Sequence, residues 1–267
     1  MTIIQNIRGQ QQIVSTIISG KVSHKVTAVK DSIYELEVVY ESLAMNLIIG
    51  DKNIIDVNSD DKDKQDMISK IFSSILHKAI TVVINKGGKV LEIRNSDNLY
   101  SGMFDNFPQL TEAQKAQFKN QLQQSFGDNA FKASFQDAFA MFPNTAVGVN
   151  DKWVTTTTME SVILAAITTN YAMKDITNDM FIIHGDATIH STGDAGYKEI
   201  NGMPMRVDNV NGTSSADYKV NKTTGWITYA RVTKDLKADM VIKDNPKTPG
   251  GITILVVANI AFTMSNK

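Results

Sequence analysis

The 267-residue sequence contains no cysteine. Disulfide bonds, zinc ribbons, cysteine-ligated iron–sulfur clusters and thiol catalysis are therefore excluded. An excess of charge of one sign is also missing, because 27 Lys and Arg residues stand against 28 Asp and Glu residues. Most nucleic-acid-binding proteins carry an excess of Lys and Arg, which this sequence does not have, so we expect no nucleic-acid partner. No stretch approaches the roughly 18 consecutive apolar residues of a membrane-spanning helix, so we expect no transmembrane span.

Familiar catalytic signatures are absent from the sequence as well. It contains no G-x-S-x-G, G-x-G-x-x-G, G-x-x-x-x-G-K-[ST] or H-E-x-x-H motif. Asp56, Asn58 and Asp60 have the spacing of the first ligands of a calcium loop, but Asp61 replaces the turn glycine and Met67 the bidentate glutamate. We interpret this polar stretch as a solvated linker. We expect no metal, no cofactor and no enzymatic activity.

Three polar residues, His184, Asp186 and His190, share one face of a predicted strand. The two histidines would lie roughly 20 Å apart along the strand, too far to bind one metal ion. His184 and Asp186 could form half of a site if another strand supplied further ligands. We favour the simpler interpretation that these are exposed or half-buried strand residues.

Alternating apolar and polar residues predict long antiparallel strands over 10–49 and again from residue 152 onward. The apolar positions are even from Tyr34 to Tyr40 and odd from Leu43 to Leu47. A shift by one residue moves side chains to the other face, so we predict a β-bulge near Glu41 and Ser42. Bulges bend strands, which favours a strongly curved sheet.

Helical periodicity appears in two segments, over about 66–77 and over 110–142. Thr111 and Gln114 have the pattern of a capping box, and Gly127 predicts the end of a first helix within the longer segment. A further helix is predicted from about residue 128 to Pro143. Between the two helical segments, residues 79–94 read as a hairpin.

Eight of the eleven phenylalanines lie between residues 104 and 142. Helices this rich in aromatic residues must bury their apolar stripes, and we expect them to cover the concave face of the sheet. Methionines on the strands would then line an apolar groove or fill an irregular core. The residues predicted to line such a groove are Phe118, Phe126, Phe131, Phe135, Phe139 and Met45.

Five short segments together resemble a known family. They are DNFPQLTEAQK (105–115), NDKW (150–153), NGMPM (201–205), KTTGW (222–226) and DNPKTPG (244–250). From about residue 2 to residue 264 the chain resembles an uncharacterised family of secreted or lipid-anchored envelope proteins of Gram-negative bacteria, with a domain of unknown function. The family has no assigned catalytic residues, so the resemblance implies none here.

The resemblance also implies a location. Members of the family carry an N-terminal export signal, and this sequence begins directly with the strand-like residues Thr2 to Gln5. We therefore expect a protein of the periplasm or one associated with the outer membrane, from which the export signal has been removed.

These observations predict a single domain, 1–267, of the α+β class and mostly β. Its long curved antiparallel sheet would be half-barrel-like, with the helical insertion of 66–77 and 110–142 covering the concave face. The half-barrel of periplasmic lipoprotein carriers has a similar architecture. The leading hypothesis is a non-enzymatic envelope protein that binds a hydrophobic small molecule, a lipid or a lipidated peptide between sheet and helices. The alternative is a structural or protein-interaction module with a solid core, no ligand and an envelope protein as its partner.

Overall fold

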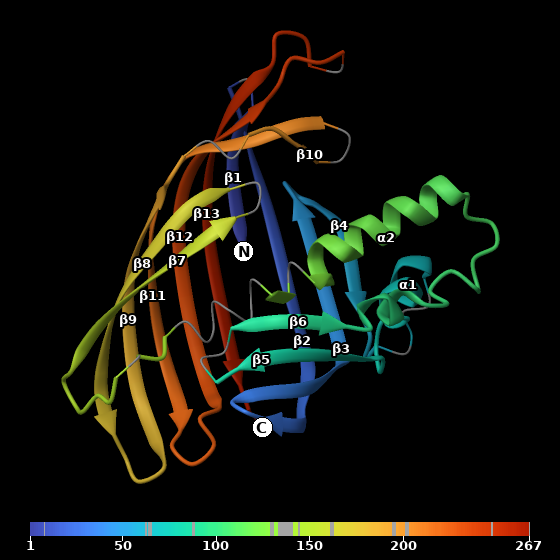
Figure 1. The fold of residues 1–267 in the computed structure, drawn as a ribbon. Helices are drawn as coiled ribbons and strands as arrows, with labels where there is room; N and C mark the ends of the chain where they lie inside the picture. Colours follow the sequence, from blue (N-terminus) through green and yellow to red (C-terminus); the bar gives the residue numbers. More distant parts are fainter. Residues whose placement is uncertain are drawn as a thin grey trace. The chain divides into compact units, whose positions relative to one another are not determined.

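The computed structural model describes the chain except for residues 8, 62, 64, 65, 87, 88, 129, 130, 133–140, 144, 161, 162, 194, 195, 201, 202, 247 and 267, and except for the side chains of 121, 124, 125, 160 and 200. The chain divides into two compact units. Unit 1 comprises Met1–Ser15 and Pro143–Lys267, and unit 2 comprises Thr16–Phe142. Strand β2 (Gln10–Lys30) contributes residues to both units (Figure 1).

Among the residues that the structure describes, thirteen strands pair into one antiparallel sheet. Besides β2 they are β1 (Thr2–Ile7), β3 (Ile33–Ile49), β4 (Lys52–Asn58), β5 (Ala79–Asn85), β6 (Val90–Arg94), β7 (Lys152–Glu160), β8 (Leu164–Ile176), β9 (Met180–Ser191), β10 (Lys198–Ile200), β11 (Met203–Asn221), β12 (Ile227–Ile242) and β13 (Ile252–Ser265). The α-helices whose bounds are described are α1 (Met67–Ser73) and α2 (Glu112–Phe126), and a short 3-10 helix, η1, spans Ser96–Tyr100.

In unit 1 the strands pair in the order β1–β13–β12–β11–β9–β8–β7, with β10 added to β11. Alternate residues of β8 and β9 are buried, as expected for strands with one apolar face. Ile167 and Ile189 belong to an apolar cluster on this face together with Val210. A register shift between Asp208 and Asn211 interrupts β11, and bulges of this kind bend a strand.

An aromatic row crosses the buried face of unit 1. Trp153 stacks on Tyr171 with ring centroids 5.6 Å apart, and Tyr171 lies 6.5 Å from Tyr218. Gly185 is the partner of Tyr171 in the neighbouring strand, and a Cβ atom at Gly185 would lie 2.6 Å from the Tyr171 ring. The glycine therefore leaves the space that the aromatic ring occupies, and Trp153 contributes to the packing of the sheet.

Unit 2 contains the sheet order β6–β5–β3–β2, with β4 added to β3. Both helices and η1 belong to this unit, and α1 packs against β3 and β4. Its largest fully buried side chains include Leu36 on β3, Ile71 on α1, Leu99 on η1, and Met103. Strands, helices and loop thus contribute to the apolar core of unit 2.

The prediction of an α+β fold with helices covering a concave face is wrong. The structure is nearly all β, and half of the described side chains of α2 are exposed, with Leu122 and Phe126 its buried apolar side chains. A stripe with one apolar residue per turn contacts a core at one end of the helix but is too narrow to cover a sheet. In unit 1, every element that the structure describes with bounds is a strand.

Several local predictions are confirmed. Thr111 and Gln114 form the capping box of α2, and Gly127 follows its last residue. The helix predicted over about 66–77 is confirmed in part, because α1 spans Met67–Ser73 and Asp66 is the cap that precedes it. The pairing of β5 with β6 confirms the predicted hairpin. The buried positions of β3 change from even to odd between Val38 and Leu43.

The polar linker is a partial error of the sequence interpretation. Residues 52–58 form β4, which pairs with β3 from Ala44 to Ile49. Val57 is 2% exposed and therefore part of the core, while Asp60 and Asp61 lie in the turn that follows. The many charged residues of this segment favoured its interpretation as a linker, although it contains the buried Val57 and pairs with β3 as a short strand.

Candidate functional site

The best-defined part of the predicted groove is the ring of Phe126 at the end of α2. It meets the Tyr40 ring edge-on at 5.9 Å and the Phe72 ring edge-on at 6.3 Å. Phe126 is 7% exposed, and burial raises the pKa of Tyr40 to about 12. Edge-to-face contacts of this kind are a favourable packing of aromatic rings in a core. The Phe126 side chain therefore lies among β3 and α1 residues that the sequence did not single out.

The other predicted groove residues have different surroundings. Phe131 is buried at 8% exposure, whereas Phe118 and Met45 are half-buried. Met45 pairs with Val57 of β4. Phe135 and Phe139 lie outside the described residues. Of the residues that can be placed, Phe126 and Phe131 are thus core residues.

A lysine holds the segment between β6 and α2 against the start of β5. The Lys78 ammonium donates hydrogen bonds to the carbonyl oxygens of Leu99 and Ser101, and burial lowers the Lys78 pKa. Leu99 and Met103 on this segment are 1% and 2% exposed. These contacts fix the segment by its backbone carbonyls and by apolar anchors.

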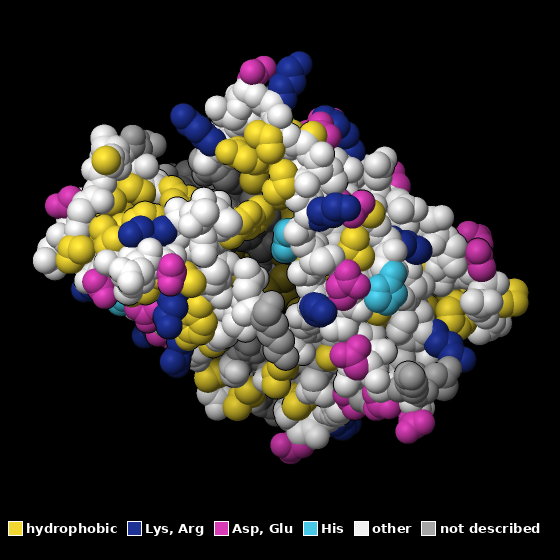
Figure 2. Space-filling model, turned by 90° about the horizontal axis from the view of Figure 1, so that it is seen from below, with side chains coloured by type: hydrophobic (Ala, Val, Ile, Leu, Met, Phe, Trp, Pro, Cys, Tyr) yellow, Lys and Arg dark blue, Asp and Glu magenta, His cyan; other side chains and the backbone are white. Residues whose placement is uncertain are grey.

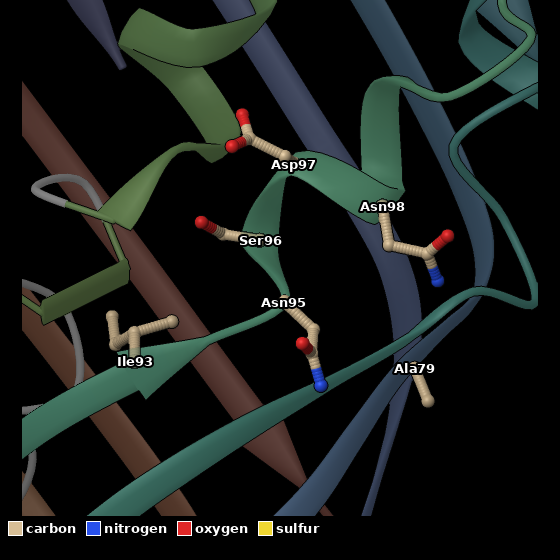
Figure 3. Close-up of a pocket in the computed structure, with 6 residues that line it drawn as sticks. All are labelled: Ala79, Ile93, Asn95, Ser96, Asp97 and Asn98. Atoms are coloured by element: carbon tan, nitrogen blue, oxygen red, sulfur yellow. The ribbon is translucent and has the colours of Figure 1, made fainter.

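A depression of about 620 Å³ lies beside this segment, lined by Ala79, Ile93, Asn95, Ser96, Asp97 and Asn98. Figure 3 shows the polar side chains of Asn95, Ser96, Asp97 and Asn98 pointing in different directions rather than converging on one point. Its lining is mainly polar, and the depression is open. It therefore has neither the apolar lining expected for a lipid nor a set of converging polar groups.

A cluster of three titratable side chains lies on the polar face of unit 1. His184 Nδ1 is 2.7 Å from Asp217 Oδ1, and His184 Nε2 is 3.1 Å from Asp186 Oδ2. Asp217 is the cross-strand partner of His184, and Asp186 follows two residues later on the same face of β9. Both ring nitrogens can donate only when the imidazole is protonated. The hydrogen bonds to Asp217 and then to Asp186 accordingly raise the His184 pKa.

The sequence identified two members of this cluster and missed the third. Asp217 is 33 residues away in the chain and reaches His184 only because β11 pairs with β9. The signal was present in the alternation of β11, where Asp217 precedes the buried Tyr218 and must therefore point to the polar face. The side chains of Asp186 and Asp217 are 68% and 64% exposed. The cluster therefore resembles a surface ion pair more than an enclosed active site.

Metal ligands do not gather among the residues that the structure describes. In that part of the chain no group of three or more His, Asp and Glu side chains has an arrangement that could hold a metal ion. Asp60 and Asp61 are turn residues, and Asn58 Oδ1 accepts a hydrogen bond from the Asp60 amide. None of the described helices is both long and apolar enough to cross a membrane.

The surface carries charges of both signs. Figure 2 shows Lys and Arg side chains interspersed with Asp and Glu on the face turned to the viewer, with apolar side chains between them. Such a mixture gives no strong field of one sign.

Residues 31–227 match the family model described as a family of unknown function, DUF6263. The chain belongs to this family. The match spans most of the chain and confirms the coarse part of the resemblance, a domain of unknown function. No curated protein and no solved structure matches the DUF6263 chain.

Proposed function

We propose that this DUF6263 protein is a non-enzymatic structural or protein-interaction module of the cell envelope. Its core would be solid, and its binding would take place on the strands rather than in a ligand cavity. The observation that carries this proposal is the packing of Phe126, whose ring contacts Tyr40 and Phe72 and is 7% exposed. A residue that lined an empty lipid groove would have apolar space in front of it rather than two aromatic edges.

Two further features support the proposal. Large apolar side chains are exposed on the strands instead of being gathered in a pocket, among them Val154 at 60% and Phe262 at 51%. The depression beside η1 is polar and open. The location in the envelope rests on the resemblance of the five sequence segments, and fractionation of the native host would test it.

The deciding experiment compares two phenylalanines of the same helix. Truncation of a packed core phenylalanine costs about 3–5 kcal/mol, because transfer energy is lost and a cavity forms. We expect Phe126→Ala to reduce the free energy of unfolding by this amount. Phe118→Ala is the matched control, since Phe118 is half-buried on the same stripe and should cost clearly less.

The same proteins are then titrated with an environment-sensitive apolar dye. The proposal expects no saturable uptake by the wild-type protein. Saturable dye binding by the wild type, together with a loss below about 3 kcal/mol in Phe126→Ala, would instead indicate a carrier with space beneath the helix.

A further inference from the structure

Strand β7 is paired on one of its two sides. It is the last strand in the order of unit 1, and β8 pairs with it from Lys152 to Glu160 without a shift in register (Figure 1). Among the described strands, none pairs with β7 on its other side, which we call the β7 edge. The residues of the β7 edge all belong to unit 1.

The backbone groups at the β7 edge belong to the even-numbered residues. The Met173 amide of β8 donates a hydrogen bond to the Asp151 carbonyl at 3.0 Å, and the register places these two residues opposite each other. Backbone groups alternate in direction along an antiparallel strand, so the odd residues of β7 face β8. The N–H and C=O groups of Val154 and Thr156 therefore point away from β8. Both residues are exposed.

The β7 edge lacks the devices that protect most strand edges. Charged residues, proline, bulges and short strands discourage pairing with other chains. From Trp153 to Met159, β7 contains no charged residue, proline or glycine, and its tryptophan, valine and threonines favour strands. The other terminal strand, β6, is shorter, carries Glu92 and Arg94, and pairs with β5 through a register shift. β7 is therefore the terminal strand that is suited to accept a further strand.

The sequence of β7 is complementary to itself when two copies run antiparallel. Around a twofold axis two copies of one strand pair in this way, and each contact occurs twice. The register that uses the whole length of both strands places Thr156 opposite its own copy. In this register Lys152 lies opposite Glu160, and these two residues carry opposite charge. Opposite charges at directly opposed positions favour the pairing of strands.

The apolar face of β7 is matched in the same register. Trp153 lies opposite Met159 of the second copy, and Thr155 lies opposite Thr157. Contacts of a methionine sulfur with an aromatic ring and pairs of threonines across two strands are both favourable. Trp153 and Met159 are half-buried in the single chain, and Val154 is 60% exposed. An added strand would cover more of these three side chains.

We propose that two copies of the chain pair through their β7 edges, so that the sheet of unit 1 continues across a twofold axis. The backbone groups of Val154 and Thr156 supply hydrogen bonds, which is how strand addition gains affinity. The charges at the two ends of the strand select the register. This inference rests on the proposed function, in which binding takes place on the strands, and it names a second copy of the chain as the partner.

The size of the β7 edge predicts a weak dimer. A stable interface takes about 20–30 residues from each subunit, whereas β7 supplies 9. Pairing should therefore depend strongly on protein concentration. A segment of a different protein could use the same backbone groups, but the match of charges and side chains is present in the sequence of β7 itself. This match favours the second copy as the occupant.

Sedimentation velocity and amide hydrogen exchange of the full chain test the pairing. From about 1 μM to about 1 mM protein, the sedimentation coefficient should rise from that of a monomer to that of a dimer. In the monomer, the amides of Val154 and Thr156 should exchange fast, and those of Thr155 and Thr157, which face β8, should exchange slowly. In the dimer, all four amides should exchange slowly.

Reversal of the charges at the strand ends tests the register. Lys152→Glu places like charges opposite each other at both ends of the interface, and so does Glu160→Lys. Each should raise the dissociation constant about tenfold, because like charges at opposed positions disfavour pairing. The double variant should return to within about threefold of the wild type. Lys237→Glu reverses an exposed charge on β12 and is the control, which should dimerise as the wild type does.

Variants of Thr156 test the backbone hydrogen bonds at the centre of the interface. Thr156→Pro removes an N–H that does not serve β8, and proline is tolerated on sheet edges. We expect it to raise the dissociation constant at least about tenfold, while Thr156→Val keeps the N–H and dimerises as the wild type does. If Thr156→Pro does not fold, the charge variants and the exchange of Val154 and Thr156 carry the test.

Several results would overturn the inference. A monomer at every concentration, equal dimerisation of folded Thr156→Pro and wild type, or charge reversals without effect would each do so. Slow exchange of Val154 and Thr156 in the monomer would also overturn it, because the chain itself would then cover the β7 edge. None of these results affects the core packing measured with Phe126→Ala, so the two proposals fail separately.

Discussion

His184 is held between two aspartates that come from different directions. Asp217 reaches one ring nitrogen from the neighbouring strand, and Asp186 reaches the other along β9. The three side chains thus join β9 to β11 on the polar face of unit 1. Because the pKa of His184 is raised in the folded protein, protonation of this histidine favours the folded state.

The sign of this linkage gives a pH-dependence prediction. The stabilisation is fully present below the ordinary histidine pKa of 6.5 and is lost as the pH rises through the raised value of the folded protein. We expect His184→Gln to lower the melting temperature more at pH ~6 than at pH ~9. The effect should be about 0.2–1 kcal/mol, because the aspartates are exposed.

The control for this prediction is His190→Gln, which replaces an exposed histidine on the same face of the same strand. It measures what replacing a histidine on this face does to the melting temperature when the contacts with Asp186 and Asp217 are kept. An equal effect of His184→Gln at low and high pH would contradict the assigned ion pair.

Tyr100 presents the opposite situation, a polar atom without a partner. Its hydroxyl is buried and has no hydrogen-bond partner among the described residues, and burial raises the Tyr100 pKa to about 12. A buried polar group without a partner costs about 1–3 kcal/mol. We expect Tyr100→Phe to raise the free energy of unfolding by about 1 kcal/mol in urea denaturation. A loss of stability would show instead that the hydroxyl makes a hydrogen bond.

Among the elements, the turn between β11 and β12 is the one most completely specified by its own residues. Asn221 Oδ1 accepts hydrogen bonds from the amides of Thr223 and Thr224, and the Gly225 amide donates to the Asn221 carbonyl. Gly225 has a φ angle of 71°, in the left-handed region. Glycine adopts this conformation without a steric cost, which is the physical reason for its place in the sequence NKTTGW.

Substitution of Gly225 tests the turn. In the left-handed region, steric repulsion of a Cβ atom destabilises the folded state by roughly 1–2 kcal/mol, and β-branched residues are the least tolerated there. We expect Gly225→Val to lower the free energy of unfolding by about this amount or more. Gly225→Asn should cost less, since asparagine adopts this conformation more readily. Equal melting temperatures of wild type and Gly225→Val would contradict the turn.

Helix α2 shows how far an element can be predicted from its own residues. Its capping box at Thr111 and Gln114 and its end at Gly127 were evident in the sequence, because each depends on residues three or four positions apart. Its place in the fold was not evident. Phe126 contacts Tyr40 and Phe72, which are distant from it in the chain. The helical periodicity of α2 does not predict these partners.

At the scale of the whole molecule, strand β2 belongs to both compact units. Residues 10–15 pair with β1 in unit 1, and residues 16–30 lie beside β3 in unit 2, where the Ser23 hydroxyl donates to Glu41. One continuous strand thus contributes to both units, and the single domain stays a prediction.

Calorimetry tests this prediction. A single domain should unfold in one transition whose calorimetric and van't Hoff enthalpies agree. Phe126→Ala changes a core residue of unit 2, so it should move this one transition to lower temperature without splitting it. Two transitions, of which only one responds to Phe126→Ala, would show that the units unfold independently.

What the sequence by itself determined is the local structure and part of the candidate clusters. The alternation of strands, the capping box at Thr111, the parity change in β3 and the glycine turn at 225 all follow from residues close together in the chain. The absence of cysteine and of familiar catalytic motifs also follows from the sequence alone. Such features depend on backbone sterics and on short-range periodicity, so they can be predicted without a structure.

Only the tertiary structure decided which of these pieces are neighbours. It placed Asp217 against His184 and buried Phe126 between β3 and α1. The expectation of helices covering the sheet failed for the same reason, since an apolar stripe shows that a residue will be buried but not what will bury it. Strand order and register arise from contacts between distant residues, and local periodicity is equally compatible with many such pairings.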